Sequence, residues 1–224
     1  MIRVNVVVEG PTEESFIDNV LARVLWPRNI FLSARLLGVP GHKGGRPNYA
    51  RLKKDVLLLL KQDRTAFCSM MLDLYGLGPG FPGTPLPPDL PGLEKAALIE
   101  DAVKTDICAL LPDLRPDVRF LPYIQVHEYE GLLFSNPEEF AECIHHAPLA
   151  EHFRRIRDNF PTPEDINDDP ATAPSKRVLA AYPRYKKVFD GTTAAMAVGV
   201  ESMRRECPHF RQWVERLESL SSQS

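Results

Sequence analysis

Acidic residues stand directly after three apolar runs that have the composition of β-strands. Glu9 follows Ile2 to Val8, Asp73 follows Ala66 to Leu72, and His127-Glu128-Tyr129-Glu130 follows Val118 to Val126. The carboxyl ends of parallel strands meet at one edge of a sheet, where ligands and catalytic groups gather. Carboxylates and water are the ligands that Mg²⁺ prefers. We therefore expect a Mg²⁺ (or Mn²⁺) site formed by Glu9, Asp73, Glu128 and Glu130.

Each of these acids also has a structural interpretation. Asp73 can cap a turn, and Glu128 or Glu130 can cap the segment toward Phe134. For His127 three roles stay open, namely metal ligand, proton shuttle and hydrogen-bonded structural residue. The recurrence of acids at three strand ends favours a functional site.

Two segments carry basic charge without any acid. Arg35 to Lys54 contains six Lys or Arg, including Lys43 and Arg46 in a glycine-rich loop. Pro174 to Lys187 adds a second set, with two tyrosines that could stack on bases: Lys176, Arg177, Tyr182, Arg184, Tyr185, Lys186 and Lys187. Such runs are usually solvated faces, but they also suit contacts to a phosphate backbone. Beside an acidic centre they indicate a nuclease, in which Lys176 or Lys186 would hold the substrate phosphate.

Composition excludes several classes of protein. The net charge of −3 over 224 residues does not suit a generically basic nucleic-acid coat. The four cysteines form no Cys-x-x-Cys pair, which favours reduced thiols in a cytoplasmic protein. No apolar run approaches the roughly 20 residues of a membrane helix. The chain also has no Walker loop, no Gly-x-Ser-x-Gly elbow and no dinucleotide fingerprint.

Strand and helix patterns alternate through the first part of the chain. Helical spacing predicts helices at Thr12 to Trp26, Asn48 to Lys61 and Leu93 to Leu111, and a further strand is expected at Ile30 to Leu37. Gly76 to Gly92 is rich in Gly and Pro and is expected to be an irregular loop. This alternation is typical of an α/β fold with a mostly parallel sheet flanked by helices.

From Asn136 onward the patterns are helical, and one of the expected helices runs from Thr192 to Arg205. We therefore expect an α/β core in residues 1–135 and a helical extension packed on it in residues 136–224. Both tryptophans, Trp26 and Trp213, lie among apolar residues at helical spacing and are expected in the core.

Several of these segments resemble a known family. Val6-Val7-Val8-Glu9-Gly10-Pro11-Thr12-Glu13, followed by Leu72-Asp73-Leu74-Tyr75, resembles the Toprim domain of topoisomerases, primases and overcoming-lysogenization-defect nucleases. More closely, the chain is similar to the domain of unknown function 4276 family, a Toprim-like group. Tyr123 to Phe134 and Pro174 to Arg177 fit the pattern of that family. The resemblance extends over nearly the whole chain.

The resemblance implies a Rossmann-like sheet and an acidic, Mg²⁺-binding centre that acts on phosphodiesters. Glu9 takes the place of the Toprim acid–base or metal-binding Glu, and Asp73 that of the first Asp of the Asp-x-Asp motif. Tyr75 stands where the second Asp is expected, so Glu128 or Glu130 would have to compensate. Relatives are often encoded beside ATPases and are associated with phage defence, which implies a partner ATPase.

Two functions follow from these observations. The first is a metal-dependent nuclease acting on DNA or RNA, in which Glu9 is general base or metal ligand and Asp73 is the principal ligand. The alternative is a catalytically degenerate Toprim-like module that binds nucleic acid or a protein partner, and the substitution by Tyr75 is its best support.

Overall fold

A parallel β-sheet forms the centre of the molecule. The computed structural model describes residues 1–38, 47–78, 80–144, 147–167 and 172–223. Within these ranges four strands pair in the order β2-β1-β3-β4, and all neighbours are parallel. The strands are β1 (Ile2–Val8), β2 (Ile30–Leu36), β3 (Phe67–Asp73) and β4 (Phe120–Gln125). The predicted α/β class with a parallel sheet is confirmed.

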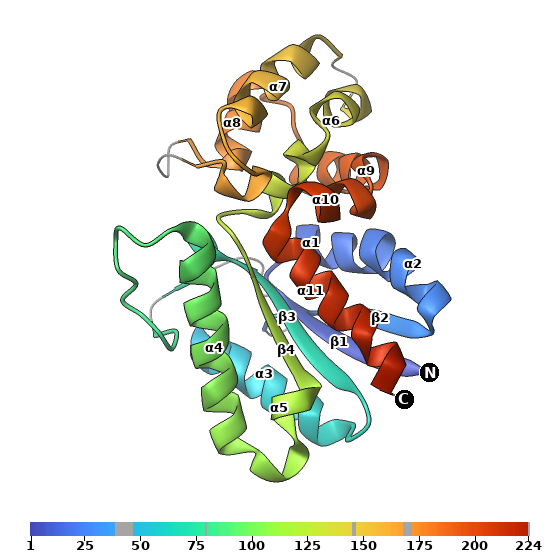
Figure 1. Ribbon diagram of the computed structural model, residues 1–224, viewed down its shortest axis with the longest axis vertical. Coiled ribbons are helices and arrows are strands. Elements are labelled where there is room, and N and C mark those ends of the chain that lie inside the picture. Colours follow the sequence, from blue (N-terminus) through green and yellow to red (C-terminus); the bar gives the residue numbers. More distant parts are fainter. Residues whose placement is uncertain (39–46, 79, 145–146, 168–171, 224) are drawn as a thin grey trace.

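Helices cover both faces of this sheet, which is why its strands appear in the sequence as continuous apolar runs. On one face, α3 (Tyr49–Gln62) and α4 (Gly92–Leu110) share a core with Met70 and Leu72 of β3. Met71 belongs to the core on the opposite face, with α1 (Pro11–Phe16) and α11 (Pro208–Ser219). Figure 1 shows α11 lying along the sheet. Residues 77, 78 and 80–91, which were expected in an irregular loop, contain no helix or strand and lead into α4.

The first helix begins at the end of β1. Gly10 is its N-cap and Pro11 its first residue, a position at which proline costs no hydrogen bond. The helix continues through a π-helical turn (Ile17–Leu21) into α2 (Ala22–Leu25). Trp26 then lies in a 3₁₀ turn at the surface and is 64% exposed, with its ring edge against Phe31. The expectation that Trp26 is a core residue was therefore wrong, because the helix has ended before it.

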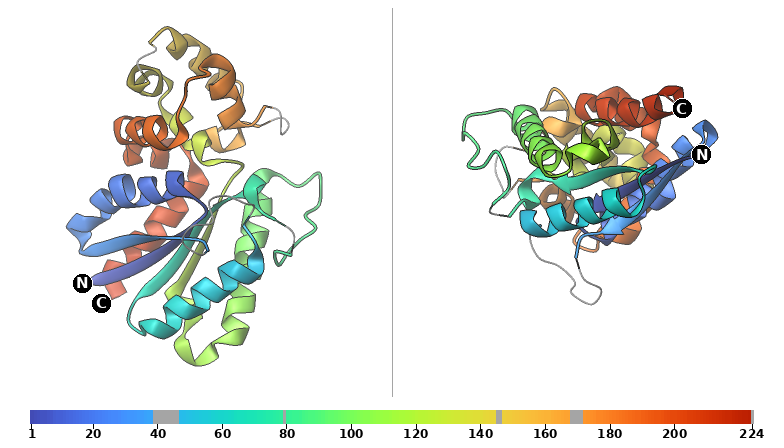
Figure 2. Two further views of the ribbon diagram at one scale, coloured as in Figure 1. Left: turned by 180° about the vertical axis from the view of Figure 1, so that it is seen from behind. Right: turned by 90° about the horizontal axis from the view of Figure 1, so that it is seen from below.

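Further helices gather beyond the carboxyl ends of the strands (Figures 1 and 2). They are α6 (Pro137–Cys143), α7 (Ala150–Asp158), α8 (Pro174–Ala181), α9 (Lys187–Val198) and α10 (Val200–Glu206). The single helix predicted for Thr192 to Arg205 is wrong. Gly199 has a φ of 77°, in the left-handed region that glycine adopts readily, and it separates α9 from α10.

The last helix, α11, returns to the sheet and ties the C-terminal part of the chain to it. The Trp213 ring stacks on Tyr123 of β4 with centroids 4.3 Å apart, and its Nε1–H donates to Ser69 Oγ of β3 at 3.0 Å. Trp213 is fully buried, as predicted. The two termini consequently lie near each other at the amino end of the sheet (Figure 2).

The strand predicted from Val118 begins two residues later, at Phe120. Pro116 starts a short helix, α5 (Pro116–Arg119), and Arg115 before it has a left-handed φ of 54°. Arg119 is buried, and its guanidinium donates to four backbone carbonyls, those of Leu60, Asp63, Ala66 and Leu114. These bonds fix the amino ends of β3 and β4 and leave their carboxyl ends to carry the acids.

Candidate functional site

Glu9 directly follows β1 and Asp73 is the last residue of the neighbouring strand β3, at the point where the strand order of the sheet reverses. Val8 of β1 pairs with Met71 of β3, so Glu9 and Asp73 lie at the same edge of the sheet. From β1 the chain passes to β2 on one side, and from β3 it passes to β4 on the other. In open α/β sheets the crevice at such a switch point is the usual ligand site. The two strand-end acids that the sequence suggested are therefore brought together.

Glu9 packs against the backbone of the segment that follows β3. A Cβ atom at Gly76 would lie 2.5 Å from Glu9 Oε2, which is closer than real contacts allow. Glycine at position 76 thus makes room for the Glu9 carboxylate. Burial raises the pKa of Glu9, partly offset by the positive charge of Lys187.

Glu13 is a further acid of this region that the sequence reasoning did not include. Its Oε2 accepts a hydrogen bond from the Gly10 N–H at 3.0 Å, which turns the side chain back toward the end of β1. The residue is 8% exposed. Burial raises the pKa of Glu13 to about 7, and the nearby charges of Glu9 and Glu130 add to the rise.

Asp73 lies in the middle of this group of acids. Its Oδ1 is buried and has no hydrogen-bond partner among the residues that the structure describes. Burial raises the pKa of Asp73 well above its usual range, and neighbouring carboxylates raise it further. In decreasing order of effect these are Glu13, Glu130, Glu9 and Glu128. Five acids are thus close enough to influence one another, and we call Glu9, Glu13, Asp73, Glu128 and Glu130 the acidic centre.

The two acids that follow β4 occupy different environments. Glu128 Oε2 accepts the backbone N–H of Ser175 at 2.9 Å, and this bond links the end of β4 to the start of α8. Glu130 lies in a 3₁₀ segment (Tyr129–Ser135) and is 1% exposed. Burial raises the pKa of Glu130 against the opposing effect of Lys187. Glu130 is therefore the more deeply buried acid of the two.

Lys187 supplies positive charge to the acidic centre. Its Nζ lies 3.1 Å from Glu130 Oε1, and its side chain remains 45% exposed. Burial lowers the pKa of Lys187, but the charges of Glu130 and Glu128 outweigh that effect and leave it raised. Lys187 is thus a protonated cation at neutral pH. It stands at the first position of α9, beside a group of acids that greatly outnumbers it.

The other predicted basic residues lie elsewhere. Lys176 and Lys186 are exposed, on α8 and just before α9, and the Lys186 N–H donates to Asp190 Oδ2. Arg177 donates through Nε to the Thr172 carbonyl and lies over the Phe160 ring. Lys43 and Arg46 fall outside the described residues. Tyr185 is 6% exposed, so the suggestion that it stacks on a base was wrong.

The donor chemistry of the acidic centre fits a hard divalent cation. All five acids offer oxygen, and the unpartnered, buried Asp73 Oδ1 is a donor atom of the kind a cation would satisfy. In the described part of the chain, however, no three His, Cys, Asp or Glu side chains stand close enough to hold a metal ion together. The residues thus fit Mg²⁺ or Mn²⁺ by type, while their side chains surround the strand ends without converging on one point.

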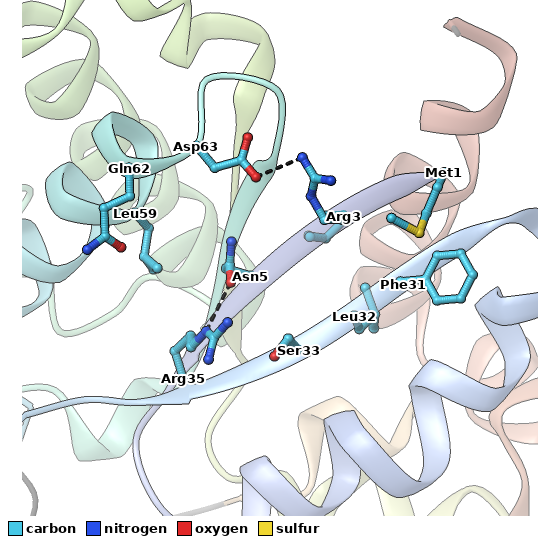
Figure 3. A pocket seen from close by; sticks show the side chains of 11 residues that line it. Met1, Arg3, Asn5, Phe31, Leu32, Ser33, Arg35, Leu59, Gln62 and Asp63 are labelled. Carbon is cyan, nitrogen blue, oxygen red and sulfur yellow. Dashed lines mark hydrogen bonds and ion pairs between the residues drawn. The ribbon is translucent and has the colours of Figure 1, made fainter.

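A separate cavity of about 620 Å³ lies over the opposite half of β1 and β2 (Figure 3). Two arginines at its wall are already engaged, Arg3 with Asp63 at 2.8 Å and Arg35 with Asn5 at 2.9 Å. The residues that line this cavity include none of the five acids. Its size suits a small ligand, but it is separate from the acidic centre, where the buried carboxylates and Lys187 lie.

Comparison with known proteins identifies the family but no activity. No helix of the described residues is long and apolar enough to cross a membrane. Neither a curated protein nor a solved structure matches the chain. One family model, described as a domain of unknown function (DUF4276), matches residues 8–218. That span contains β2, β3, β4 and every acid of the acidic centre. Because the match covers nearly the whole chain, the chain belongs to the DUF4276 family.

Proposed function

We propose that this protein is a metal-dependent phosphodiesterase, and more specifically a nuclease acting on DNA or RNA. The observation that carries the proposal is the gathering of five mutually interacting carboxylates around the switch point of a parallel sheet. They come from the end of β1, from α1, from β3 and from the segment after β4, and Lys187 is ion-paired to one of them. Acids that hold a cation and a lysine that meets a phosphate are the parts that phosphodiester hydrolysis needs.

Asp73 and Glu130 are the residues that would hold a Mg²⁺ or Mn²⁺ ion, with Glu13 and Glu128 in support. Such an ion, when bound, polarises a phosphoryl oxygen and lowers the pKa of a bound water. Burial of like charges at this density is costly without a counter-ion, and the raised pKa of Asp73 expresses that cost. A divalent cation would remove much of it.

The protein's own groups would perform the remaining tasks. Glu9 is half-buried at the strand end, and it would accept the proton of the attacking water or act as a further ligand. Lys187 can bind a phosphate oxygen through its exposed portion and stabilise the charge that develops on it. We assign this role to Lys187 in preference to Lys186 and Lys176, because Lys187 is the lysine in contact with the acidic centre.

Although Tyr75 stands where the second Asp of the Asp-x-Asp motif is expected, the acidic centre contains other acids close to Asp73. Glu13 and Glu130 influence Asp73 more strongly than Glu9 does, and neither belongs to the Asp-x-Asp segment. We propose that these two carboxylates take the place of the second aspartate. Their burial, 8% and 1% exposed, keeps them facing the interior of the site.

The competing function is a non-catalytic Toprim-like module that binds nucleic acid or a protein. One observation favours it, namely that no three potential ligands of the described residues are gathered closely enough to hold a metal. The two functions differ in whether a divalent cation binds at the acidic centre and whether phosphodiesters are cleaved. A partner ATPase and a role in phage defence fit either function and stay part of this proposal.

The test is cleavage of labelled DNA and RNA by the purified protein with Mg²⁺, Mn²⁺ or EDTA. We expect cation-dependent cleavage that Asp73→Asn and Glu9→Gln reduce at least about 100-fold. Asp101→Asn and Glu94→Gln are matched controls, since both acids are exposed on α4 and lie outside the acidic centre. Cleavage that proceeds equally well in EDTA, or at an undiminished rate in the Asp73→Asn and Glu9→Gln variants, would exclude the proposed function.

A further inference from the structure

Tyr75 stands at the rim of the acidic centre. It lies in a 3₁₀ turn (Leu74–Gly76) that directly follows Asp73. The residue after it, Gly76, is the one whose backbone receives the Glu9 carboxylate. The tyrosine is therefore attached to the backbone between Asp73 and the residue that contacts Glu9.

The Tyr75 ring is held in place by His127. The two ring centroids lie 5.0 Å apart with an interplanar angle of 43°, and the Tyr75 N–H donates to the His127 carbonyl at 3.2 Å. The loop between β4 and the 3₁₀ segment thus contacts Tyr75 through both its backbone and the His127 ring. A fixed aromatic ring loses little entropy when a second ring stacks on it.

His127 is itself tightly constrained. It has a φ of 60°, a left-handed conformation that is uncommon for a non-glycine residue. Its imidazole lies against the α-carbon of Gly92, where a Cβ atom would come within 2.9 Å of Nε2 and Cε1. The close approach of Gly92 and the strained backbone therefore fix the imidazole beside the Tyr75 ring. Support of this ring is an additional role for His127 beside the three left open, and the buried Nδ1 atom of its imidazole has no hydrogen-bond partner among the described residues.

Tyr75 is accessible where other aromatic residues near the acids are not. It is 36% exposed, whereas Tyr129 is 0% and Tyr185 is 6% exposed. A tyrosine after a buried strand would usually pack into the core, yet this one presents surface to solvent beside the site. Exposed aromatic rings at a nucleic-acid site stack on bases, irrespective of base identity.

The charge of the centre makes such a contact useful. Five carboxylates with one lysine repel a polyanionic strand, so phosphate contacts alone bind it weakly. Stacking supplies binding free energy that does not depend on charge. A base inside a duplex is already stacked on its neighbours, so the ring can accept only an unpaired base.

We infer that Tyr75, supported by His127 and Gly92, is a stacking platform for an unpaired base, and that the acidic centre therefore takes single-stranded or locally unpaired nucleic acid. This inference rests on the proposed nuclease function, because it names the substrate class of the same site. It assigns Tyr75 to substrate binding through its ring, with no covalent role for its hydroxyl.

The test measures binding separately from cleavage. Fluorescence anisotropy would compare a labelled single-stranded oligonucleotide with its duplex, using the 224-residue chain with Asp73→Asn to suppress cleavage. We expect the single strand to bind more tightly and Tyr75→Leu to weaken it about 5- to 100-fold, while Tyr75→Phe keeps the affinity. His127→Ala should weaken it in the same direction. Phe189→Leu is the matched control, because Phe189 is 71% exposed on α9 and outside the acidic centre.

Three results would contradict the role of Tyr75 as a stacking platform. The first is no binding of the single strand, and the second is an affinity of Tyr75→Leu equal to that of the wild-type residue. The third is a loss of affinity in Tyr75→Phe as large as that in Tyr75→Leu, which would show that the hydroxyl makes the contact. Circular dichroism and thermal unfolding of each variant show whether a loss of affinity is a loss of fold. Cleavage by the wild-type protein is scored independently. If the protein binds single strands through the Tyr75 ring but cleaves nothing, the proposed nuclease activity is excluded and the role of Tyr75 as a stacking platform is retained.

Discussion

The carboxylate of Glu9 lies directly over the α-carbon of Gly76, at a separation that leaves no room for a methyl group. A Cβ atom at position 76 would meet Glu9 Oε2 at 2.5 Å. The contact joins the ends of β1 and β3, two strands whose sequences are more than sixty residues apart, as the pairing of Val8 with Met71 requires. It is the most direct structural link between the Glu-Gly and Asp segments that the sequence singled out.

Gly76→Ala should therefore impair function without unfolding the protein. The atom that must move is the far end of a flexible side chain, so we expect the free energy of unfolding to change by less than about 1 kcal/mol. A displaced catalytic carboxylate costs roughly 10- to 100-fold in rate. Urea denaturation and initial cleavage rates measure the two quantities. A large loss of stability, or an unchanged rate, would contradict the position that we assign to Glu9.

Lys187 and its neighbour Lys186 form a matched pair for a charge test. Lys187→Gln removes the partner of the buried Glu130 carboxylate, and we expect a stability loss of about 2 kcal/mol and a rate loss of about 100-fold. Lys186→Gln changes an exposed side chain and should alter neither quantity appreciably. Denaturation and cleavage assays on both variants decide the assignment. Equal effects of the two substitutions would show that the ion pair has no special role.

The acidic centre should make stability fall as pH rises. Burial raises the pKa of Glu13 from 4.5 to about 7, so the folded protein binds this proton more tightly than the unfolded chain does. The stabilising proton is present below pH 4.5 and is lost as pH rises to 7, with a linkage effect of about 3 kcal/mol. We expect Glu13→Gln to make this slope shallower in EDTA, with the remaining slope due to the other acids whose pKa values are raised, and the control Glu94→Gln to retain the full slope. Urea denaturation at pH 5, 6 and 7 gives the slope, and an increase in stability over that range would refute the prediction.

Ser69 tests how α11 is attached to the sheet. Its hydroxyl donates to the Leu121 carbonyl and accepts the Trp213 Nε1–H at 3.0 Å, all in buried surroundings. Ser69→Ala leaves the indole N–H without its acceptor, so we expect a loss of about 1–3 kcal/mol in the free energy of unfolding. A double-mutant cycle with Trp213→Phe checks the cause, because the two losses should not add. Additive losses would show that the hydrogen bond contributes nothing.

The strand ends were predictable from the sequence for a simple reason. A parallel strand buried on both faces is an uninterrupted apolar run, and Glu9 and Asp73 mark where two such runs stop. The same pattern identified β4, although its first two expected residues belong to the short helix that begins at Pro116. The ends of β1 and β3 lie side by side because of the strand order in the sheet. A local sequence pattern does not reveal that order.

Glu13 and Lys187 show what the sequence could not reveal. Glu13 appears as one of two acids in the first turn of a helix, where acids are common because they interact favourably with the helix dipole. Its return toward Gly10 and its proximity to Asp73 are tertiary facts. Lys186 and Lys187 are equivalent in sequence, and the first turn of α9 decides which of them points to Glu130.

Calorimetric titration of the 224-residue chain with Mn²⁺ tests the central claim most directly. We predict saturable binding that raises the thermal midpoint of unfolding, that is lost in Asp73→Asn and that is retained in Asp101→Asn. Absence of binding to the wild-type protein, or equal binding to Asp73→Asn, would contradict the assignment of the acidic centre as a cation site.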